Sequence, residues 1–330
     1  MLTDSENDIQ MSLDEFIMIR DFIHEKSGIY FAENKMYLVK NRLIKRMAEL
    51  GIKNIRDYFY HVKYDVSLKE FNQLMNLVTT NETSFFRNEP QLLSFSEEVL
   101  PLLVKEKLVA GESKTLKIWS AGCSSGEEPY TLAIILLEKM ILMPGWNLEI
   151  LANDISESVL QRARNGEYSG ITLRNVAPAI LNRYFTKVGE MYRINPEAKS
   201  LVKFFHMNLN EGRRMNMMTG VDVIFFRNVM IYFSDEVKKQ IIRGFYNSLK
   251  PGGFLYIGHS ETLHGLSKAF RLVYFKNALV YRKEIQKAEK EIVHTTVFSG
   301  TAASTAGAAG GAKRAMDLLN KIKPMSTVNK

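Results

Sequence analysis

Apolar residues recur at helical spacing from the start of the chain to about Thr80. Segment 12–28, SLDEFIMIRDFIHEKSG, carries Phe16, Ile19, Phe22 and Ile23 on one face. Ser12 is a favourable N-cap for this segment and Gly28 a favourable stop. The pattern predicts a helix between these two residues, two or three more helices after it, and an all-α N-terminal domain over residues 1–85.

The second helical segment, 35–50, combines an apolar stripe with basic residues. Its apolar positions are Met36, Val39, Leu43, Met47 and Leu50. At about 100° per residue, Lys35, Arg42 and Arg46 share one side of the helix, while Lys45 points away. The sequence therefore predicts a helix with concentrated positive charge on its surface.

From about Leu116 the pattern changes to continuous apolar runs with helical segments between most of them. The runs lie at 116–121, 148–155, 202–209, 221–229 and 253–260. Such runs are typical of parallel strands that are buried on both faces. The helical segments lie at 129–140, 156–166 and 234–253. This alternation predicts a doubly wound α/β domain, which we assign to residues 86–284.

Two segments depart from this alternation. The runs 271–275 and 278–283 are too close together for a crossover helix, so they predict an antiparallel hairpin. Between about 169 and 200, prolines and a glycine separate a short helix from hairpin-like pieces. These pieces, at 184–189, 190–195 and 201–205, predict a small inserted antiparallel sheet.

The C-terminal segment, 285–330, has the composition of a flexible, low-complexity tail. Its stretch 299–312, SGTAASTAGAAGGA, resembles a linker. The following stretch 313–323 has the pattern of a short amphipathic helix, although a solvated tail is the favoured interpretation.

Composition narrows the class of protein. No run of about 18 apolar residues exists and the N-terminus lacks the features of a signal peptide, so we expect a cytoplasmic protein with no membrane insertion. The single cysteine, Cys123, excludes an internal disulfide, and no Cys/His cluster indicates a metal. The net charge of +8 favours an acidic partner, which could be nucleic acid, a membrane or a protein surface.

The loop after the first predicted strand, within WSAGCSSGEEPY at 119–130, indicates a ligand site. In open α/β sheets, ligands lie at the carboxyl ends of the strands, and Gly122 and Gly126 would let the backbone pass close to one. The loop lacks the G-x-G-x-x-G pattern of a dinucleotide site. Glu127 and Glu128 would repel a pyrophosphate and attract a cation.

S-adenosylmethionine combines an adenosine with positive charge and has no phosphate, so it fits these features. Asp154 ends the second strand, where its carboxylate can accept both ribose hydroxyls. Asn208 ends the third strand, where its amide can read the adenine edge. Cys123 has no candidate base nearby and is interpreted as a small loop residue rather than a nucleophile. Tyr130 is expected to pack beneath the loop.

Several stretches taken together resemble the CheR family of chemotaxis receptor methyltransferases. They are NETSFFRNEPQL, SAGCSSGEEPYTLAI, ANDISESVLQRARNGEY, FRNVMIYF and LKPGGFLYIGHSETL, and the resemblance extends from the N-terminal helices to about Arg282. It implies a class I S-adenosylmethionine-dependent methyltransferase sheet with an antiparallel final hairpin, an all-α N-terminal domain and a small β insertion. The implied activity is methylation of glutamate side chains on the cytoplasmic helical bundle of bacterial chemoreceptors.

The resemblance also implies site residues. Together with Gly122 of the loop, the expected cofactor contacts are Asn81, Thr83, Arg87, Glu128, Asp154, Asn208, Leu209, Arg227 and Asn228. Tyr232 is expected to line the reaction centre, and Arg87 and Tyr232 are the candidate catalytic residues. A glutamate side chain, with a pKa of about 4.3, is already ionised at neutral pH and needs no general base. Arg87 could hold a carboxylate in a forked contact, and both the cofactor's and the substrate's carboxylates are candidates.

The resemblance suggests a role for the basic helix, which is to steer an acidic receptor bundle towards the site. The residues expected to do this are Lys35, Arg42, Lys45 and Arg46. We expect a monomer that does not bind nucleic acid. Two alternatives stay open: a methyltransferase acting on nucleic acid or an amine, and a non-catalytic S-adenosylmethionine-sensing adaptor. The segment RNVMIY lacks the prolines typical of enzymes that methylate base nitrogens, and the complete set of motifs favours activity.

Overall fold

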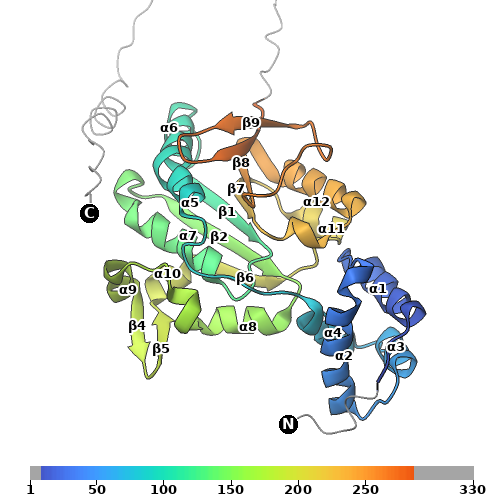
Figure 1. Cartoon of the computed structure of the whole chain (residues 1–330). Coiled ribbons are helices and arrows are strands. Elements are labelled where there is room, and N and C mark those ends of the chain that lie inside the picture. Colours follow the sequence, from blue (N-terminus) through green and yellow to red (C-terminus); the bar gives the residue numbers. More distant parts are fainter. Residues whose placement is uncertain (1–8, 286–330) are drawn as a thin grey trace, which may run out of the picture. The chain divides into compact units, whose positions relative to one another are not determined.

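The computed structural model describes residues 9–285, which form part of a single compact unit that ends at Gln286. The tail expected from residue 285 onwards, and the helix considered at 313–323, lie outside the described residues apart from residue 285 itself. The described residues contain an all-α region, a large mixed sheet covered by helices, and a small antiparallel sheet (Figure 1). The fold class predicted from the sequence is confirmed.

The N-terminal region consists of helices around their own core. They are α1 (Leu13–Ser27), the short η1 (Glu33–Lys35), α2 (Met36–Leu50), α3 (Ile55–Lys63) and α4 (Lys69–Val78). Helix α1 begins and ends where the sequence indicates. Ser12 and Glu15 form a reciprocal capping box at its start, and Gly28 ends it with φ of 78°. Phe16, Val39 and Met75 lie in the shared core, so these helices bury a common face.

The large sheet has seven strands. They are β1 (Thr115–Ala121), β2 (Asn147–Asp154), β6 (Val202–His206), β7 (Val221–Phe226), β8 (Leu249–Ile257), β9 (Phe270–Tyr274) and β10 (Leu279–Lys283). Their order is β6-β2-β1-β7-β8-β10-β9, and the first five in this order pair in parallel. The predicted hairpin is β9–β10, and β10 rather than β9 pairs with β8, antiparallel.

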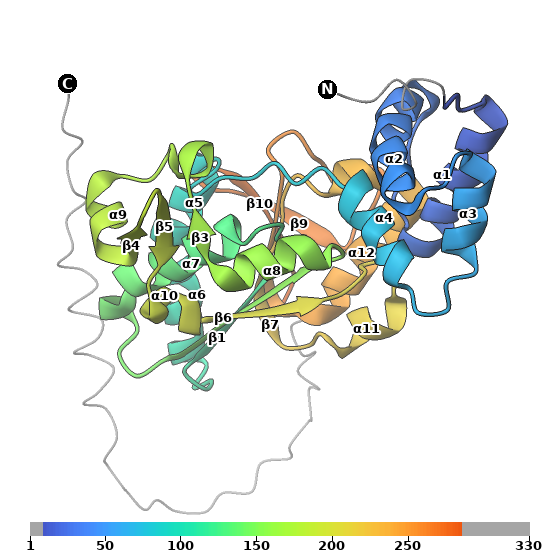
Figure 2. The ribbon, with the colours of Figure 1, turned by 90° about the horizontal axis from the view of Figure 1, so that it is seen from below.

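Helices cover both faces of this sheet, which explains the continuous apolar runs. They are α5 (Glu89–Ser94), the π-helical η2 (Phe95–Val99), α6 (Leu100–Val109), α7 (Glu127–Glu138), η3 (Met140–Leu142), α8 (Glu157–Asn165), α11 (Gly212–Met217) and α12 (Asp235–Ser248). Successive residues of β7 enter different cores: Phe225 packs with residues of α5 to α7, whereas Phe226 packs with residues of α12. Figures 1 and 2 show α7 and α12 separated by the sheet.

The small sheet differs in one strand from the prediction. Its strands are β3 (Glu167–Tyr168), β4 (Phe185–Val188) and β5 (Met191–Ile194), in the order β3-β5-β4, with η4 (Gly170–Leu173), α9 (Pro178–Tyr184) and α10 (Pro196–Ser200) around it. The β4–β5 hairpin agrees with the sequence. The piece 201–205 was also expected in this sheet, but its residues from Val202 onwards form β6 of the large sheet instead. The third strand is the two-residue β3, which is too short to leave a periodic pattern.

Candidate active site

A cavity of about 310 Å³ opens at the carboxyl ends of the parallel strands. This volume lies at the lower end of the range of roughly 300–1,000 Å³ usual for small-molecule pockets. One side is formed by residues at or after the ends of β1, β2, β6 and β7. The opposite wall is the segment 78–84, which leads out of α4, together with Ser27, Ile29 and Phe31 from the helical region. The cavity is therefore built jointly by the helical and the α/β parts of the chain.

The loop between β1 and α7 is fixed to β2 by its backbone. The amides of Gly122 and Cys123 both donate to the carbonyl of Asn153, at 2.9 Å each. Gly122 has φ of 75°, and a Cβ atom there would lie 2.7 Å from Cγ2 of Val229. The loop thus requires glycine at position 122 because of its φ angle and of Val229. Gly126, which was expected beside the ligand, does not line the cavity.

Asp154 is buried and its carboxylate is held by backbone amides. Oδ2 accepts from the amide of Ser124 at 2.9 Å, and Oδ1 accepts from that of Ser156 at 3.0 Å. Burial raises the pKa of Asp154, while the backbone hydrogen bonds lower it. A carboxylate has about four lone-pair sites. Asp154 therefore keeps acceptor capacity on the cavity side, as the recognition of two hydroxyls requires.

The two adjacent glutamates at the start of α7 have different environments. Glu127 is 1% exposed, accepts the hydroxyl of Ser125 at 2.8 Å, and does not line the cavity. The expectation that both carboxylates face the ligand is wrong for Glu127, because successive side chains of a helix point in different directions. Glu128 does line the cavity, accepting from Ser120 Oγ at 2.7 Å. Its Oε2 lies 3.4 Å from Nη1 of Arg227.

Two arginines at the site have contrasting surroundings. Arg227 is 8% exposed, pairs with Glu128 and donates from Nη2 to the carbonyl of Arg87. Arg87 is exposed at the cavity, and Nη1 donates to the carbonyl of Glu82 at 3.1 Å. Among residues 9–285, Arg87 forms no ion pair. Arg227 is thus a fixed part of the wall, whereas the guanidinium of Arg87 retains donors for an incoming carboxylate.

The backbone around the site is strained. Positive φ angles at non-glycine residues occur at Phe86 (52°), Asn88 (60°), Ser124 (49°) and Asn228 (60°). The first two flank Arg87, and the last two line the cavity. Such conformations cost about 1–3 kcal/mol each and are concentrated at functional sites.

The amide of Asn208 is partly engaged within the protein. Nδ2 donates to the carbonyl of Lys26 at 2.7 Å, and Oδ1 accepts from the amide of Asn210 at 2.9 Å. One N–H and one lone pair remain, so the amide can still contribute a donor and an acceptor to a ligand. Asn208 also connects the α/β part to the end of α1, a role that its position in the sequence does not indicate.

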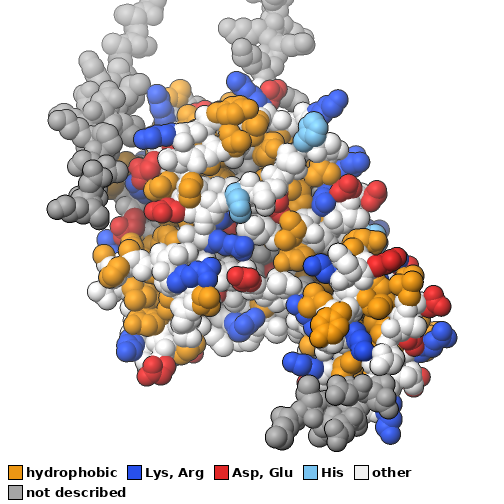
Figure 3. Space-filling model, viewed as in Figure 1, with side chains coloured by type: hydrophobic (Ala, Val, Ile, Leu, Met, Phe, Trp, Pro, Cys, Tyr) orange, Lys and Arg blue, Asp and Glu red, His pale blue; other side chains and the backbone are white. Residues whose placement is uncertain are grey.

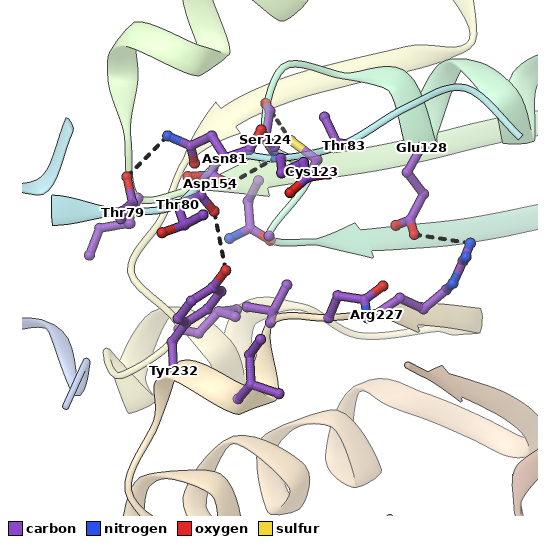
Figure 4. Close-up of a pocket in the computed structure, with 18 of the residues that line it drawn as sticks. Thr79, Thr80, Asn81, Thr83, Cys123, Ser124, Glu128, Asp154, Arg227 and Tyr232 are labelled. Carbon is purple, nitrogen blue, oxygen red and sulfur yellow. Dashed lines mark hydrogen bonds and ion pairs between the residues drawn. The ribbon is translucent and has the colours of Figure 1, made fainter. Parts of the chain in front are cut away.

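Tyr232 belongs to the short helix η5 (Met230–Tyr232), which follows β7. Its hydroxyl donates to the carbonyl of Thr80 at 3.3 Å (Figure 4). Burial raises the pKa of Tyr232 above its ordinary value of 10.0, so the phenol stays protonated at neutral pH. Tyr232 can therefore donate a hydrogen bond or position a substrate at this site, and it does not act as a base there.

All the predicted cofactor residues lie on the cavity wall. They are Asn81, Thr83, Arg87, Gly122, Glu128, Asp154, Asn208, Leu209, Arg227 and Asn228, and Tyr232 lies with them. The four predicted receptor contacts, Lys35, Arg42, Lys45 and Arg46, lie outside the lining. These placements bring the candidate residues together, while their roles stay predictions.

Sequence reasoning missed several residues of the wall. Asn153 accepts from Trp119 Nε1 at 2.7 Å and donates to the carbonyl of Met207 at 3.1 Å, which links β1 and β2 to the residue after β6 at the cavity wall. Its position beside Asp154 at a strand end was the available signal. Thr79 and Thr80 could have been found only from the tertiary contact between the linker and Tyr232.

Other side chains near the cavity have structural surroundings. Cys123 is buried, and burial raises the pKa of its thiol, which disfavours the thiolate that a nucleophile requires. The hydroxyl of Tyr130 donates to the carbonyl of Ala163 at 2.9 Å beneath the loop. Within residues 9–285 no group of three or more His, Cys, Asp or Glu side chains is arranged to hold a metal ion.

This sheet order, with a carboxylate-lined cavity at the strand ends, is that of an S-adenosylmethionine-dependent methyltransferase. Residues 81–279 match the family described as "CheR methyltransferase, SAM binding domain", and residues 14–79 match "CheR methyltransferase, all-alpha domain". The chain belongs to the CheR methyltransferase family.

Curated relatives agree with this assignment. The chain is 35% identical to chemotaxis protein methyltransferase 2 of Vibrio cholerae over 84% of its own length and 95% of that protein. It is 35% identical to chemotaxis protein methyltransferase 1 of Pseudomonas aeruginosa over 81% of its length and 97% of that protein. It is 34% identical to the chemotaxis protein methyltransferase of Escherichia coli, over 78% and 87%.

The residues present fit the cofactor. Asp154 and Glu128 supply carboxylate acceptors within the cavity. The first turn of α7 carries acidic and no basic side chains. Such a wall favours a ligand with hydroxyls and positive charge over a phosphate. When bound, S-adenosylmethionine supplies a methyl group that is activated by its sulfonium.

Proposed function

We propose that this protein methylates glutamate side chains on the cytoplasmic helical bundle of bacterial chemoreceptors, giving methyl esters. The observation that carries the proposal is Arg87, whose exposed guanidinium lies at the cavity next to the fixed pair of Glu128 and Arg227. Because Arg87 forms no ion pair within residues 9–285, it can receive the carboxylate of an incoming substrate.

The chemistry suits a site without a general base. A glutamate carboxylate is ionised at neutral pH, so the protein has only to align it and to exclude water. Arg87 would orient the carboxylate, and the protonated hydroxyl of Tyr232 would border its approach. Alignment of this kind can contribute up to about 7–11 kcal/mol to lowering the barrier.

The proposed receptor-facing surface around α2 contains fewer of the basic residues than the sequence analysis expected. Arg46 is not available to a partner, because its guanidinium binds the buried carboxylate of Glu70 at 2.7 Å. Arg42 donates to the carbonyl of Val78 at the end of α4 and to that of Thr79 after it. Lys35 and Lys45 are exposed, on different sides of the helix, and Tyr37 in its first turn is 74% exposed. We therefore propose Lys35 and Lys45, with Tyr37 as an apolar contact, as the docking residues.

In the view of Figure 3, lysines and arginines are scattered among acidic and apolar side chains and form no single basic field. On this face, the distribution favours a local docking surface over a broad phosphate-binding one. Among the described residues no helix is long and apolar enough to cross a bilayer. We propose that the protein acts as a monomer in the cytoplasm.

The test is transfer of a labelled methyl group from S-adenosylmethionine to receptor-containing membranes. We expect labelled receptor whose label is released by mild alkali, because carboxyl esters hydrolyse readily there. Alkali-stable label on nucleic acid or on amines would support the first alternative. Cofactor binding with no transfer to any of these substrates would support a sensing adaptor.

A further inference from the structure

Arg42 of α2 contacts the cavity wall and not solvent alone. Nη1 donates to the carbonyl of Val78 at 2.5 Å and to that of Thr79 at 3.4 Å, and Nη2 donates to Thr80 Oγ1 at 3.3 Å. Val78 is the last residue of α4, so its carbonyl has no donor within the helix. A guanidinium satisfies this carbonyl and complements the negative end of the helix dipole.

The three residues held by Arg42 are themselves part of the cavity lining. From them the contacts continue to the candidate site residues. Thr80 O accepts the hydroxyl of Tyr232 at 3.3 Å, and Thr79 Oγ1 accepts from Asn81 Nδ2 at 3.2 Å (Figure 4). The Asn81 carbonyl in turn accepts from Ser124 Oγ at 3.2 Å. A shift of the linker would therefore displace groups on two sides of the cavity.

We propose that Arg42 is a positioning residue, which fixes the Val78–Thr80 wall of the cofactor cavity from α2. It acts through the linker and does not touch the reacting atoms. This inference rests on the use of S-adenosylmethionine and is independent of the identity of the methyl acceptor. The proposed role of Arg42 differs from that of Lys45 on the same helix. Lys45 is exposed and has no side-chain partner among residues 9–285.

The experiment measures the affinity of the full chain for S-adenosylhomocysteine by calorimetry, without receptor. We expect the Arg42→Lys variant to lose least affinity, Arg42→Gln more, and Arg42→Ala most. The loss for Arg42→Ala should be about tenfold, because charged hydrogen bonds to the wall are removed. Lys45→Ala is the matched control, since it removes one positive charge from the same helix, and it should bind like the wild type.

Wild-type affinity throughout the Arg42 series would overturn the inference, because a residue that only contacts the receptor has no effect in its absence. Circular dichroism identifies the folded variants, and if the alanine variant does not fold, the lysine and glutamine variants decide by the same criterion. A wild-type protein that binds the nucleoside but methylates no receptor would contradict the proposed function and leave this test intact.

Discussion

At the scale of single residues, surroundings decide what chemically identical side chains can do. Arg227 and Arg87 both line the cavity, but Arg227 is buried beside Glu128 whereas Arg87 is exposed and forms no ion pair among residues 9–285. Glu127 and Glu128 differ in their position, because only Glu128 reaches the cavity. For the arginines, the exposed Arg87 is the one expected to receive a substrate carboxylate, and for the glutamates, Glu128 is the one expected to meet a ligand because it lines the cavity.

Replacing Arg87 by alanine should lower methyl transfer by about 10- to 100-fold, because one or two charged hydrogen bonds to a carboxylate are worth about 1.5–3 kcal/mol. Initial rates with labelled S-adenosylmethionine and receptor measure this loss. Arg213→Ala is the control, since that exposed arginine lies on α11 away from the cavity. Equal rates for wild type and Arg87→Ala would remove Arg87 from the site.

The affinity for S-adenosylmethionine should decrease on acidification. Burial raises the pKa of Glu128, an effect that Arg227 partly offsets, and burial also raises the pKa of Asp154. Both carboxyls therefore take up protons above the usual range of about 4. As the pH falls through a raised pKa, the anion becomes neutral and affinity for a positive ligand drops, by up to about tenfold per pH unit for one proton.

Calorimetric titrations between neutral pH and pH 5 test this dependence. Glu128→Gln should bind more weakly at neutral pH and lose less affinity on acidification, since one of the two titrating groups is gone. An identical acid dependence in wild type and variant would exclude Glu128 as a contributor.

At the scale of elements, the loop between β1 and α7 shows how a short segment transmits packing to the site. Its conformation depends on Gly122, on the carbonyl of Asn153 and on Val229 from the segment after β7. Because two other elements hold this loop, a small change in either of them moves the cavity wall.

Gly122→Ala should therefore weaken cofactor binding through two separable effects. The added Cβ would lie 2.7 Å from Val229 Cγ2, and the left-handed φ of 75° costs a non-glycine residue about 1–2 kcal/mol. Combining it with Val229→Ala should relieve the first effect and leave the second. Affinity for S-adenosylhomocysteine in the single and double variants measures both. Full recovery of this affinity in the double variant would show that the left-handed φ angle at position 122 does not weaken binding.

The elements that local patterns determine were predictable. Helix α1 has its cap, stripe and stop within one segment, and the apolar runs of β1 and β7 follow from burial on both faces. The features that depend on long-range contacts were not predictable. The two-residue β3, the orientation of Glu127 and the bond from Asn208 to Lys26 depend on partners distant in the sequence. The residues of the candidate site could be predicted mainly because the sequence resembles a known family. Residues outside the motifs that carry the resemblance, such as Thr79, were missed.

At the scale of the whole molecule, the proposed docking surface and the cavity belong to different regions of one compact unit. Lys45 lies on α2 and Lys35 is its N-cap, while the cavity lies between the helical region and the large sheet. Receptor recognition and cofactor binding should therefore respond to different substitutions.

Charge reversal at both Lys35 and Lys45 should raise the KM for receptor several-fold, with little change in affinity for S-adenosylhomocysteine. The expected effect should shrink at high salt, because the Debye length is only about 3 Å at 1 M ionic strength. Lys105→Glu on α6 provides a control of equal charge change per site. An unchanged KM for receptor would place the docking surface elsewhere.

The wall from Val78 to Ser84 has a consequence for recombining members of this family. The two family matches end at residue 79 and begin at residue 81, so the obvious junction for a chimaera lies inside that wall. A hybrid joined there could take Arg42, Val78 and Thr79 from one parent and Thr80, with the rest of the wall up to Ser84, from the other. Joining the parents downstream of Ser84 keeps the supporting arginine and its acceptors as an inherited pair, and hybrids made that way should retain the cofactor more often.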